Sequence, residues 1–377
     1  MHPSILRHAA PTCTSQAPEV AWQGGYCSQT VTQVLHREPA PTAPAEPRQR
    51  RSRPPYLRTI GLYAITLWAV ITLVFFLPRL LPGDPLRQLE DADSGQFIYD
   101  TAERERVAAY YGLDKPLISQ YRTYLSDLRH GEFGWSISQN QPVAELLKKR
   151  LPWTLLLTGG ALALSSALSF FAGVTAGWHR GRFADRSLIV VLSTTRAIPE
   201  YALAAALLIL FAVTYPVFPQ AGGQRAFAEY ASPLEAVGDI LFHLALPLTA
   251  LTIGLAANKF LIVRNTVIST LGEDYMVLAR AKGLSRRLLK YRHSGRNALL
   301  PFVTALGIQA GFAVSGSPFV ETIFNYPGLG SLVTRAVDAR DYPLLQGCFI
   351  SIAVAVLIAN LAVELTYAKL DPRVRRR

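Results

Sequence analysis

Charged side chains are scarce in this chain of 377 residues. They make up 17% of it, whereas 50% of the residues are hydrophobic and the mean hydropathy is +0.21. A soluble protein of this size carries more charge, so the composition favours an integral membrane protein. Cysteine is nearly absent, with Cys13 and Cys27 near the N-terminus and Cys348 near the C-terminus. Three cysteines in these positions indicate neither a disulfide framework nor a metal site.

Motifs for nucleotide binding and catalysis are missing as well. The chain contains no G-x-x-x-x-G-K-[ST], so it has no P-loop that would cradle nucleotide phosphates. It contains no H-E-x-x-H and no visible pair of nucleophile and base, and its seven histidines are scattered without ligand spacing. We therefore expect that the chain is not an enzyme and that it binds no cofactor and no metal.

Six long apolar runs are present instead. Each is long enough to cross a hydrocarbon core of about 30 Å as a helix, which needs about 20 residues. The runs lack the alternation of membrane-spanning strands, and helices satisfy their own backbone groups in lipid. We predict an all-α membrane protein with six transmembrane helices. These helices are expected at 59–80, 153–178, 187–215, 240–263, 301–324 and 344–368.

The distribution of basic residues predicts the orientation of these helices. The net charge is +12, and the segment 259–297 alone carries nine basic and two acidic residues. The connections 79–150, 216–239 and 325–342 carry no net positive charge. Because positively charged connections stay in the cytoplasm, we expect both termini and 259–297 on that side. Topology, rather than nucleic-acid binding, then explains the basic character of the chain.

The N-terminal residues 1–55 form a segment of different composition. The stretch is rich in proline and alanine, and we predict a disordered cytoplasmic tail because it cannot bury enough apolar surface to fold. It lacks the apolar core of a signal peptide. An ordinary solvated tail, or an over-extended start site, is one interpretation. A regulatory or lipid-binding tail is the other, because a basic cluster at 48–53 precedes the first apolar run.

The remaining residues, 56–377, are predicted to form the membrane domain. Its connection 82–150 is expected to be a helical insertion on the extracytoplasmic side, after the first transmembrane helix. Three stretches in it read as short helices, and Gly112 and Gly131 are plausible helix ends. These stretches are "TAERERVAAYYGLD", "PLISQYRTYLSDLRHG" and "QPVAELLKKRLP".

The basic stretch "EDYMVLARAKGLSRRLLKYRH", residues 273–293, lies between two apolar runs, and we call it the finger. Its acidic start, Glu273 and Asp274, suits the N-terminus of a helix, where the helix dipole favours negative charge. Gly283 is expected to end this helix, and Ser285 is expected to cap a second short helix at 286–292. The sequence therefore predicts a helix–turn–helix that projects into the cytoplasm.

After the finger, "NALLP" at 297–301 is predicted to turn the chain back into the membrane. An ordinary positive-inside loop would explain the charge of this region. It would not explain the acidic start, the glycine hinge, the cap and the proline together, so we favour the finger.

Charged residues inside the apolar runs are candidates for a transport pathway. Arg196 and Glu200 in "TTRAIPEY" lie four residues apart, so we expect them on one helix face, where they can pair. Charge within a membrane usually faces a protein interior or an aqueous cavity, which favours a pathway role. The alternative is that both residues lie near the cytoplasmic end and snorkel. Glu321 in "VETIF" is the third candidate.

Small residues predict where helices approach closely. Gly173 and Gly177 form a G-x-x-x-G pair, and Gly307 and Gly311 form another. Such pairs let helix backbones come together in a membrane, so we expect both pairs at packing contacts.

The finger resembles the cytoplasmic EAA-type loop of ABC-importer permeases, in the variant of the dipeptide, oligopeptide and nickel transport group. The resemblance extends over roughly 56–377 and implies a permease subunit of an ATP-driven importer for peptides or a related small solute. It also implies a multi-pass protein of the bacterial inner membrane. Its further landmarks are "LPRLLPGDP", "YGLDKPLISQY", "HGEFGWS", "FVETIFNYPGLG", "DYPLLQG" and "YAKLDPRVR".

The same resemblance implies partners and a coupling site. The partners are a second permease, two ATP-binding subunits and an extracytoplasmic substrate-binding protein, together with membrane lipid. The cytoplasmic loop 264–300 would place the finger in a groove of an ATP-binding subunit. Val277 stands where the strict EAA pattern has glutamate, and Asp274 is a possible substitute. The residues implied to couple are Asp274, Ala279, Lys282, Gly283, Leu284, Arg287, Leu288 and Tyr291.

Two other classes of protein remain as alternatives. A six-span channel or secondary transporter that works alone fits the apolar runs, but it would not need the finger. A membrane enzyme fits less well, because the sequence contains no catalytic constellation. The sequence leaves open whether the solute is a dipeptide, an oligopeptide or a nickel chelate.

Overall fold

The structure is a computed structural model that describes residues 55–80 and 115–370. Nearly all of the predicted tail, and the predicted helix at 101–114, lie outside these described residues. In chain order the described elements are α1 (Pro55–Leu80), α3 (Leu117–Arg129), β1 (Trp135–Ser136), β2 (Gln141–Pro142), α4 (Val143–Trp178), α5 (Phe183–Ala197), α6 (Glu200–Leu208), η3 (Ile209–Thr214), α7 (Pro233–Thr270), α8 (Asp274–Ala281), α9 (Arg286–Leu288), η4 (Leu289–Gly295), α10 (Arg296–Ile323), α11 (Leu329–Asp338) and α12 (Tyr342–Leu370).

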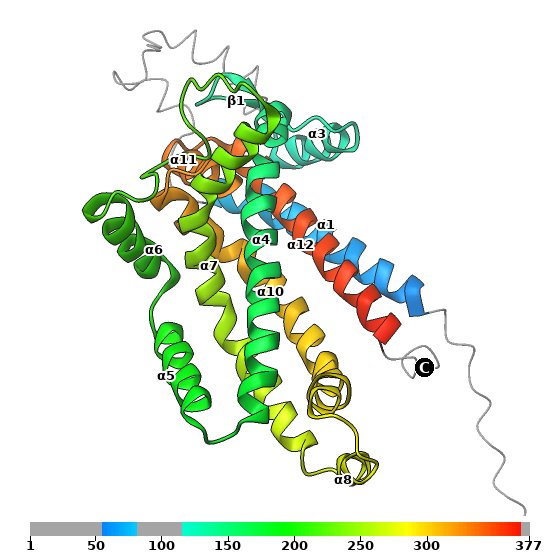
Figure 1. Cartoon of the computed structure of the whole chain (residues 1–377). Coiled ribbons are helices and arrows are strands. Elements are labelled where there is room, and N and C mark those ends of the chain that lie inside the picture. The colour runs from blue at the N-terminus through cyan, green and yellow to red at the C-terminus, as the bar shows by residue number, and fades with distance from the viewer. Residues whose placement is uncertain (1–54, 81–114, 371–377) are drawn as a thin grey trace, which may run out of the picture. The chain divides into compact units, whose positions relative to one another are not determined.

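Three long helices, α4, α7 and α10, form the centre of the molecule (Figure 1). Helices α1 and α12 pack together on one flank, and α5 and α6 lie on the other flank against α7. The short strands β1 and β2, with α3 and α11, lie at one end of the long helices. Helices α8 and α9 lie at the opposite end. We call these two ends the hairpin end and the finger end.

Several of these helices suit a membrane. Helices α1, α4, α7 and α12 are each long and apolar enough to cross one, and the bent pair α5 and α6–η3 could supply a fifth span. Helix α10, with 28 residues, covers nearly all of the fifth predicted run, 301–324. The described part of the chain therefore has four or five candidate spans by length and composition, and each predicted run lies mainly in helix.

The predicted helix at 187–215 is not straight. The chain bends by 101° between α5 and α6, and Ile198 at the break is extended, with φ −89° and ψ 125°. The cause is Pro199, because a proline disfavours helical backbone in the residue before it. The same proline then fixes the backbone at the start of the next helix, which begins at Glu200.

The hairpin end differs from the prediction in one respect. The predicted helix at 116–131 is present as α3, and Gly131 follows its end with φ +77°. The stretch 141–152, however, is not a separate short helix. Its last ten residues are the first turns of α4, which continues past Pro152 as one helix of 36 residues. The predicted boundary of the insertion at 150 therefore falls inside a helix.

Asp341 joins the hairpin end to the start of α12. Its Oδ2 accepts hydrogen bonds from the Ser136 hydroxyl (2.6 Å) and from the Ser138 backbone N–H and hydroxyl (2.9 and 2.8 Å). Its Oδ1 accepts a bond from the backbone N–H of Leu344 (3.1 Å), so the carboxylate also caps the helix. Asp341 therefore holds the "HGEFGWS" segment against the "DYPLLQG" segment at the start of α12.

Helices α4 and α7 approach each other closely at two glycines. A Cβ added at Gly177 would lie 2.8 Å from the carbonyl oxygen of Arg264 and from Cβ of Val267. A Cβ at Gly173 would lie 2.8 Å from Cβ of Val263. Contacts this short leave no room for a side chain, so these two glycines allow the helices to touch along the finger half of α4.

The second predicted glycine pair lies between α10 and α12, with looser geometry. A Cβ at Gly307 would lie 3.1 Å from Cγ1 of Val363, and one at Gly311 would lie 3.9 Å from Cγ1 of Val356. The second distance is an ordinary van der Waals contact. Gly307 therefore faces a close neighbour, whereas the space beside Gly311 would accept a methyl group.

Gly177→Ala should destabilise the protein, because the added methyl group overlaps α7, and overpacking of this kind typically costs about 1–3 kcal/mol. Gly159→Ala on the same helix is the matched control, since nothing lies within 4 Å of its added Cβ. Alanine favours helix over glycine by about 1 kcal/mol, so the control should be neutral or stabilising. Thermal unfolding of the two purified variants measures the difference, and equal midpoints would contradict the packing described here.

Candidate functional site

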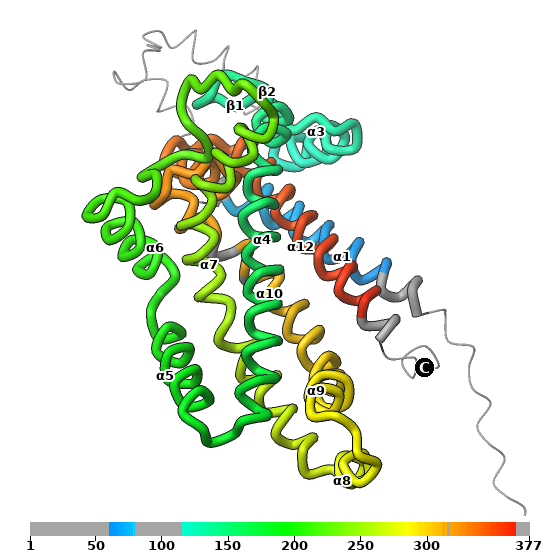
Figure 2. Tube along the Cα trace, in the orientation of Figure 1, coloured from blue at the N-terminus to red at the C-terminus, as the bar shows by residue number. Residues whose placement is uncertain are grey.

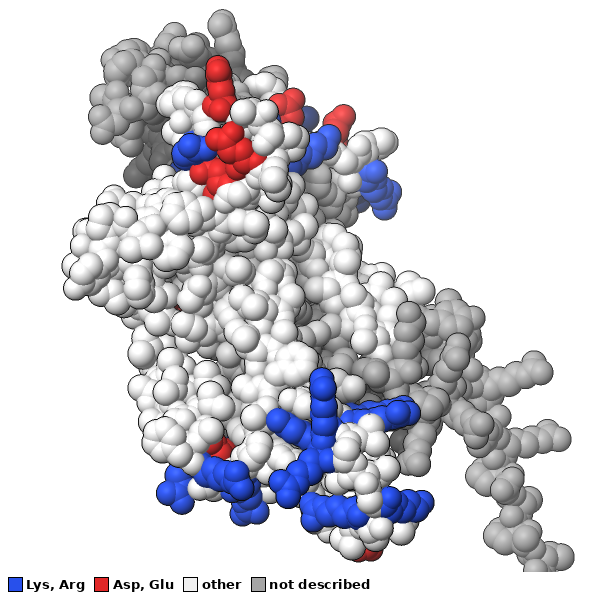
Figure 3. All heavy atoms as spheres, in the orientation of Figure 1, with Lys and Arg blue, Asp and Glu red and all other residues white. Residues whose placement is uncertain are grey.

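The two ends of the molecule differ in charge. On the face drawn in Figure 3, Lys and Arg side chains gather at the finger end, around α8, α9 and the start of α5. Acidic side chains, with a few basic ones, gather at the hairpin end. This is the distribution that the sequence predicts for a membrane protein whose finger end faces the cytoplasm.

The finger has the hinge and the cap that the sequence predicts. Helix α8 begins at Asp274 and ends at Ala281, and Gly283 follows with φ +73°. That backbone conformation favours glycine, although nothing within 4 Å would touch a Cβ there. The Ser285 hydroxyl accepts a hydrogen bond from the backbone N–H of Leu288 (3.4 Å) and caps α9.

The predicted turn at 297–301 is wrong. The backbone stays helical from Arg286 through α9, η4 and α10, and Pro301 lies inside α10. In Figure 2 the coil labelled α9 is seen nearly end-on and α10 lengthwise, so the chain changes direction before it reaches Pro301. A proline inside a helix removes one backbone hydrogen bond and costs about 3 kcal/mol. Here Ala298, Phe302 and Val303 on the same turns are buried against α4 and α7. Their burial outweighs the missing bond, so the helix continues.

Packing within the finger divides its side chains into buried and exposed sets. Met276, Ala279 and Leu289 are buried together, with Leu284 partly buried against them. Ala279, predicted to couple, is 6% exposed and points into the finger rather than outward. Trp178 at the end of α4 and Leu271 at the end of α7 complete this cluster, which fixes the base of the finger to both helices.

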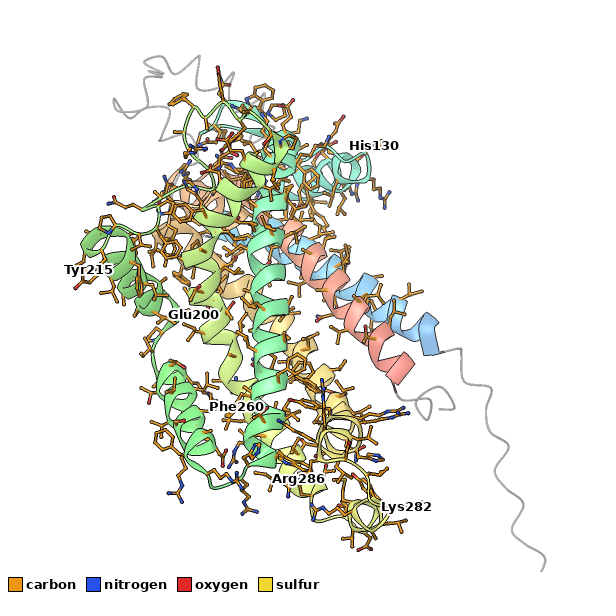
Figure 4. The ribbon with its side chains drawn as sticks, in the orientation of Figure 1. His130, Glu200, Tyr215, Phe260, Lys282 and Arg286 are labelled. Carbon is orange, nitrogen blue, oxygen red and sulfur yellow. The ribbon has the colours of Figure 1, made fainter. Side chains whose placement is uncertain are left out.

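Two exposed apolar side chains of α8 are not among the residues that the sequence analysis predicted to couple. Val277 is 59% exposed and Leu278 is 56% exposed, at the outer side of the finger. A signal was available in the spacing, because Met276 and Ala279, three residues apart, share the buried face and leave the residues between them outside. Figure 4 places Lys282 and Arg286 at this same end of the molecule.

The other predicted coupling residues occupy different surroundings. Asp274, Lys282 and Arg287 are exposed, and Leu288 is partly buried. Tyr291 lies beside α4, with its ring centroid 6.4 Å from that of Phe171. A hydrogen bond with the neighbouring Lys290 lowers the pKa of the Tyr291 phenol, and the Lys290 ammonium also bonds the Thr175 hydroxyl of α4 at 3.0 Å. The second half of the finger is thereby attached along α4.

Arg196 and Glu200 do not share a helix face, so that part of the prediction is wrong. The break at Pro199 puts Arg196 at the end of α5 and Glu200 at the start of α6. No ion pair between them occurs in the structure of these described helices. Arg196 is exposed, whereas Glu200 is partly buried and lies against Gly254 of α7. A Cβ at Gly254 would be 3.0 Å from Cγ of Glu200.

The position of the break bears on the alternative that both residues snorkel to a membrane surface. Phe183, the first residue of α5, and Arg196 are 13 positions apart, which corresponds to about 20 Å along a helix. Figure 4 shows Glu200 about half-way between the finger end and the hairpin end. The two charged residues therefore lie far from the end at which α5 begins.

Glu321 is fully buried, and each of its oxygens is held by two donors. Oε1 accepts hydrogen bonds from the hydroxyls of Thr154 (2.8 Å) and Ser317 (3.2 Å). Oε2 accepts bonds from the backbone N–H groups of Gly330 (2.6 Å) and Ser331 (3.2 Å) at the start of α11. The carboxylate thus ties α4, α10 and α11 together and stabilises a helix N-terminus.

The glycines of "NYPGLG" allow Glu321 to reach that position. A Cβ at Gly328 would lie 2.2 Å from Oε2 of Glu321, and one at Gly330 would lie 2.4 Å from Cα of Pro318. No other residue fits at these two positions without displacing the carboxylate or the helix. The geometry therefore gives this landmark a structural explanation, while a direct role of Glu321 in a pathway stays a prediction.

Lys259 is a buried charge that the sequence analysis missed. It belongs to α7 and is 0% exposed, and its Nζ donates hydrogen bonds to the hydroxyls of Ser165 (2.7 Å) and Ser166 (3.0 Å) of α4. A single lysine within the apolar run "LTIGLAANKFLIV" was the available signal. A charge inside a membrane helix is costly and is kept where a protein interior satisfies it, as the two serines do here.

Replacing Ser165 and Ser166 together by alanine should destabilise the protein more than Lys259→Met does. The double variant leaves the ammonium buried without acceptors, and hydrogen bonds to charged groups contribute about 1.5–3 kcal/mol each. The methionine variant removes the charge and keeps most of the volume, which is often nearly neutral. Thermal unfolding in detergent compares the variants. A larger loss for Lys259→Met would mean that the ammonium itself stabilises the contact.

Known proteins resemble this chain over most of its length. Residues 169–376 match the family described as binding-protein-dependent transport system inner membrane component. A Brucella ovis protein named as a peptide permease is 36% identical over 82% of this chain and 95% of its own length. The glutathione transport system permease protein GsiC of Escherichia coli (strain K12) is 34% identical over 84% of this chain and 97% of its own length. The chain therefore belongs to the family of inner-membrane permease components of binding-protein-dependent ABC importers.

Proposed function

We propose that this chain is one of two permease subunits of an importer that carries short peptides across the bacterial inner membrane. The names of its relatives, a peptide permease and a glutathione permease, support peptides as the solute. The expected complex contains a second permease, two ATP-binding subunits and an extracytoplasmic substrate-binding protein. A stand-alone channel or secondary transporter would have no use for a finger fixed to two long helices.

The proposed topology has six spans and both termini in the cytoplasm. Helix α10 is the sixth span in addition to α1, α4, α7, α12 and the bent pair α5 and α6–η3. The basic finger end faces the cytoplasm, and the hairpin end, with the insertion at 82–150, faces the opposite side. The gathering of basic side chains at the finger end supports this orientation.

The observation that supports coupling of the finger to an ATP-binding subunit is its exposed apolar pair, Val277 and Leu278. Val277 and Leu278 are exposed at the outer side of α8, with Arg280 beside them. Exposed apolar side chains rimmed by charge are typical of a surface that binds a protein partner. We propose that this pair enters the groove of an ATP-binding subunit. Asp274, Lys282, Arg287, Leu288 and Tyr291 stay proposed contacts around it.

The base of the finger supports the transmission of movement. Met276 and Leu289 are buried against Trp178 of α4 and Leu271 of α7. A displacement of α8 by the ATP-binding subunit would therefore move the ends of both helices. Ala279 acts in this proposal as a packing residue within the finger, and Gly283 acts as the turn that sets the angle between α8 and α9.

Leu278→Ala should weaken binding of the ATP-binding subunit about five- to tenfold. Burial of the exposed part of a leucine contributes about 1–1.5 kcal/mol, and each 1.4 kcal/mol is a factor of ten in affinity. Leu234→Ala is the matched control, because Leu234 is 82% exposed at the hairpin end of α7. Affinity is measured between the purified permease pair and the ATP-binding subunit.

Equal affinities of the Leu278 and Leu234 variants would contradict a docking role for the exposed pair. Coupling is then scored separately in reconstituted vesicles, as the ratio of peptide uptake to ATP hydrolysis. If neither the affinity nor the ratio of uptake to hydrolysis changes, the finger is an ordinary positively charged cytoplasmic loop without a coupling role.

We further propose that Arg196 and Glu200 line the pathway at the break between α5 and α6. Arg196→Gln and Glu200→Gln should each lower peptide uptake several-fold in vesicles that contain the assembled complex. Arg186→Gln is the control, because Arg186 is exposed in the first turn of α5, near the finger end. If both pathway variants transport peptide at the wild-type rate, the two charged side chains do not line the pathway and contribute only to the local structure between α5 and α6.

A further inference from the structure

A cavity of about 700 Å³ lies at the hairpin end, away from the finger and from the break between α5 and α6. Its walls come from the end of α1, one face of α3, the segment that leads to β1, and the first turns of α4 and α12. An apolar groove of about 280 Å³ adjoins it and shares Phe133 with it. We propose that the cavity and the groove together bind one zwitterionic phospholipid, with its headgroup in the cavity and an acyl chain in the groove.

The cavity presents hydrogen-bond donors suited to a phosphate. Arg79 lies in the last turn of α1, with its guanidinium carbon 3.8 Å from the centre of the Phe75 ring, and it donates bonds to Phe75 O (2.7 Å) and Gln120 Oε1 (3.3 Å). These contacts fix the orientation of the guanidinium at the cavity wall. Lys115 is a second cation in the lining of the cavity. Arginine is well suited to phosphate because its planar group offers several donors.

Two buried polar groups of the cavity have no hydrogen-bond partner among the residues that the structure describes. The hydroxyl of Tyr124 and Nε2 of Gln346 are both buried and make no hydrogen bond, and both residues line the cavity. Gln346 is only 6% exposed. Burial raises the pKa of Tyr124, so its hydroxyl keeps its proton and can donate. Buried donors without acceptors are costly, and phosphate oxygens in the cavity would satisfy them.

The lining of the cavity also contains carboxylates. Asp127 and Glu132 line it together with the cations. Asp127 follows Gln120, the partner of Arg79, by seven residues, which corresponds to about 10 Å along α3. A headgroup with phosphate and amine a few ångströms apart, and a contact of about 3 Å at each end, spans this distance. The two charge signs therefore favour a headgroup with a primary amine over a purely anionic one.

The groove supplies a place for an acyl chain. It is lined by Leu151 and Leu155 of α4 and by α12 from Ile350 to Ile358, a length of about 12 Å along the helix. Both helices are long and apolar enough to cross a membrane. A groove between two such helices faces acyl chains, and it begins at Phe133, where the polar cavity ends. A free peptide would match the charges of the cavity, but it would leave this groove empty.

The test uses the complete transporter, purified from membranes in mild detergent and examined by native mass spectrometry and lipid extraction. The wild-type complex should retain one phosphatidylethanolamine for each copy of this chain. Delipidated complex returned to vesicles of phosphatidylethanolamine, phosphatidylcholine and phosphatidylglycerol in equal amounts should retain phosphatidylethanolamine at least fivefold over phosphatidylglycerol. Equal retention of the three lipids would overturn the proposed headgroup site.

Two variants separate the halves of the site, each with a matched control. Arg79→Gln should lower phosphatidylethanolamine retention at least fivefold, whereas Arg129→Gln, in the last turn of α3 but outside the cavity, should not. Ala355→Trp, which fills the groove, should have the same effect, whereas Leu365→Trp, exposed on the same helix, should not.

Full retention in both Arg79→Gln and Ala355→Trp would overturn the proposal. So would release of the lipid by millimolar dipeptide, because the cavity would then be a peptide site. Thermal unfolding of the four variants in parallel excludes general misfolding as the cause of lost lipid. These outcomes are independent of the coupling tests, which address the opposite end of the molecule.

Discussion

The close contact between α4 and α7 is the constraint on which the other features depend. Small side chains on α4 permit it, first Ser165 and Ser169 and then Gly173 and Gly177 toward the finger end. Within a membrane, apolar burial gives little preference for one helix neighbour over another, so close packing and hydrogen bonds decide which helices pair. The Ser169 hydroxyl makes such a bond, to the carbonyl oxygen of Ala256 at 2.8 Å. The two helices thereby form one closely packed pair that reaches from the hairpin end to the finger.

Buried charge in this protein is used to hold elements in place. Asp185 at the start of α5 accepts two hydrogen bonds from the Arg264 guanidinium of α7, at 2.6 and 2.8 Å, and one from the backbone N–H of Gly181. Asp341 and Glu321 each bind a helix start and a second segment. In all three cases the carboxylate is nearly or fully buried and has several donors, which is the condition under which a buried charge is tolerated. A carboxylate with so many structural partners has little capacity left for a moving solute.

Local signals in the sequence predicted the parts of the fold that local physics decides. The apolar runs, the Gly283 turn and the Ser285 cap follow from helix length, positive φ and hydroxyl capping, and the structure has each of them. The errors occur where tertiary contacts override a local preference. Pro301 was expected to interrupt the chain, but it lies in a helix whose neighbouring turns are buried. Pro199, in contrast, lies where the helix does break. The hydropathy of 187–215 did not reveal this break, because the residues on both sides of Pro199 are mostly apolar.

In the finger, too, tertiary contacts decide what the sequence could not predict. Similarity to a family marks a segment, but it does not tell which side chains point outward, and Ala279 and Val277, two residues apart, differ from 6% to 59% exposed. The buried side chains of the finger hold α8 to the ends of α4 and α7. In the proposed mechanism, a partner that binds the exposed side chains would therefore displace α8 together with these helix ends. Because the backbone stays helical from α9 through η4 into α10, a displacement of the finger would in this proposal also act on a third long helix. Helix α5 is linked to α7 by Asp185 and Arg264, and its far end is the break that carries Arg196. We propose that a movement which starts at the finger reaches the region between α5 and α6 through this link.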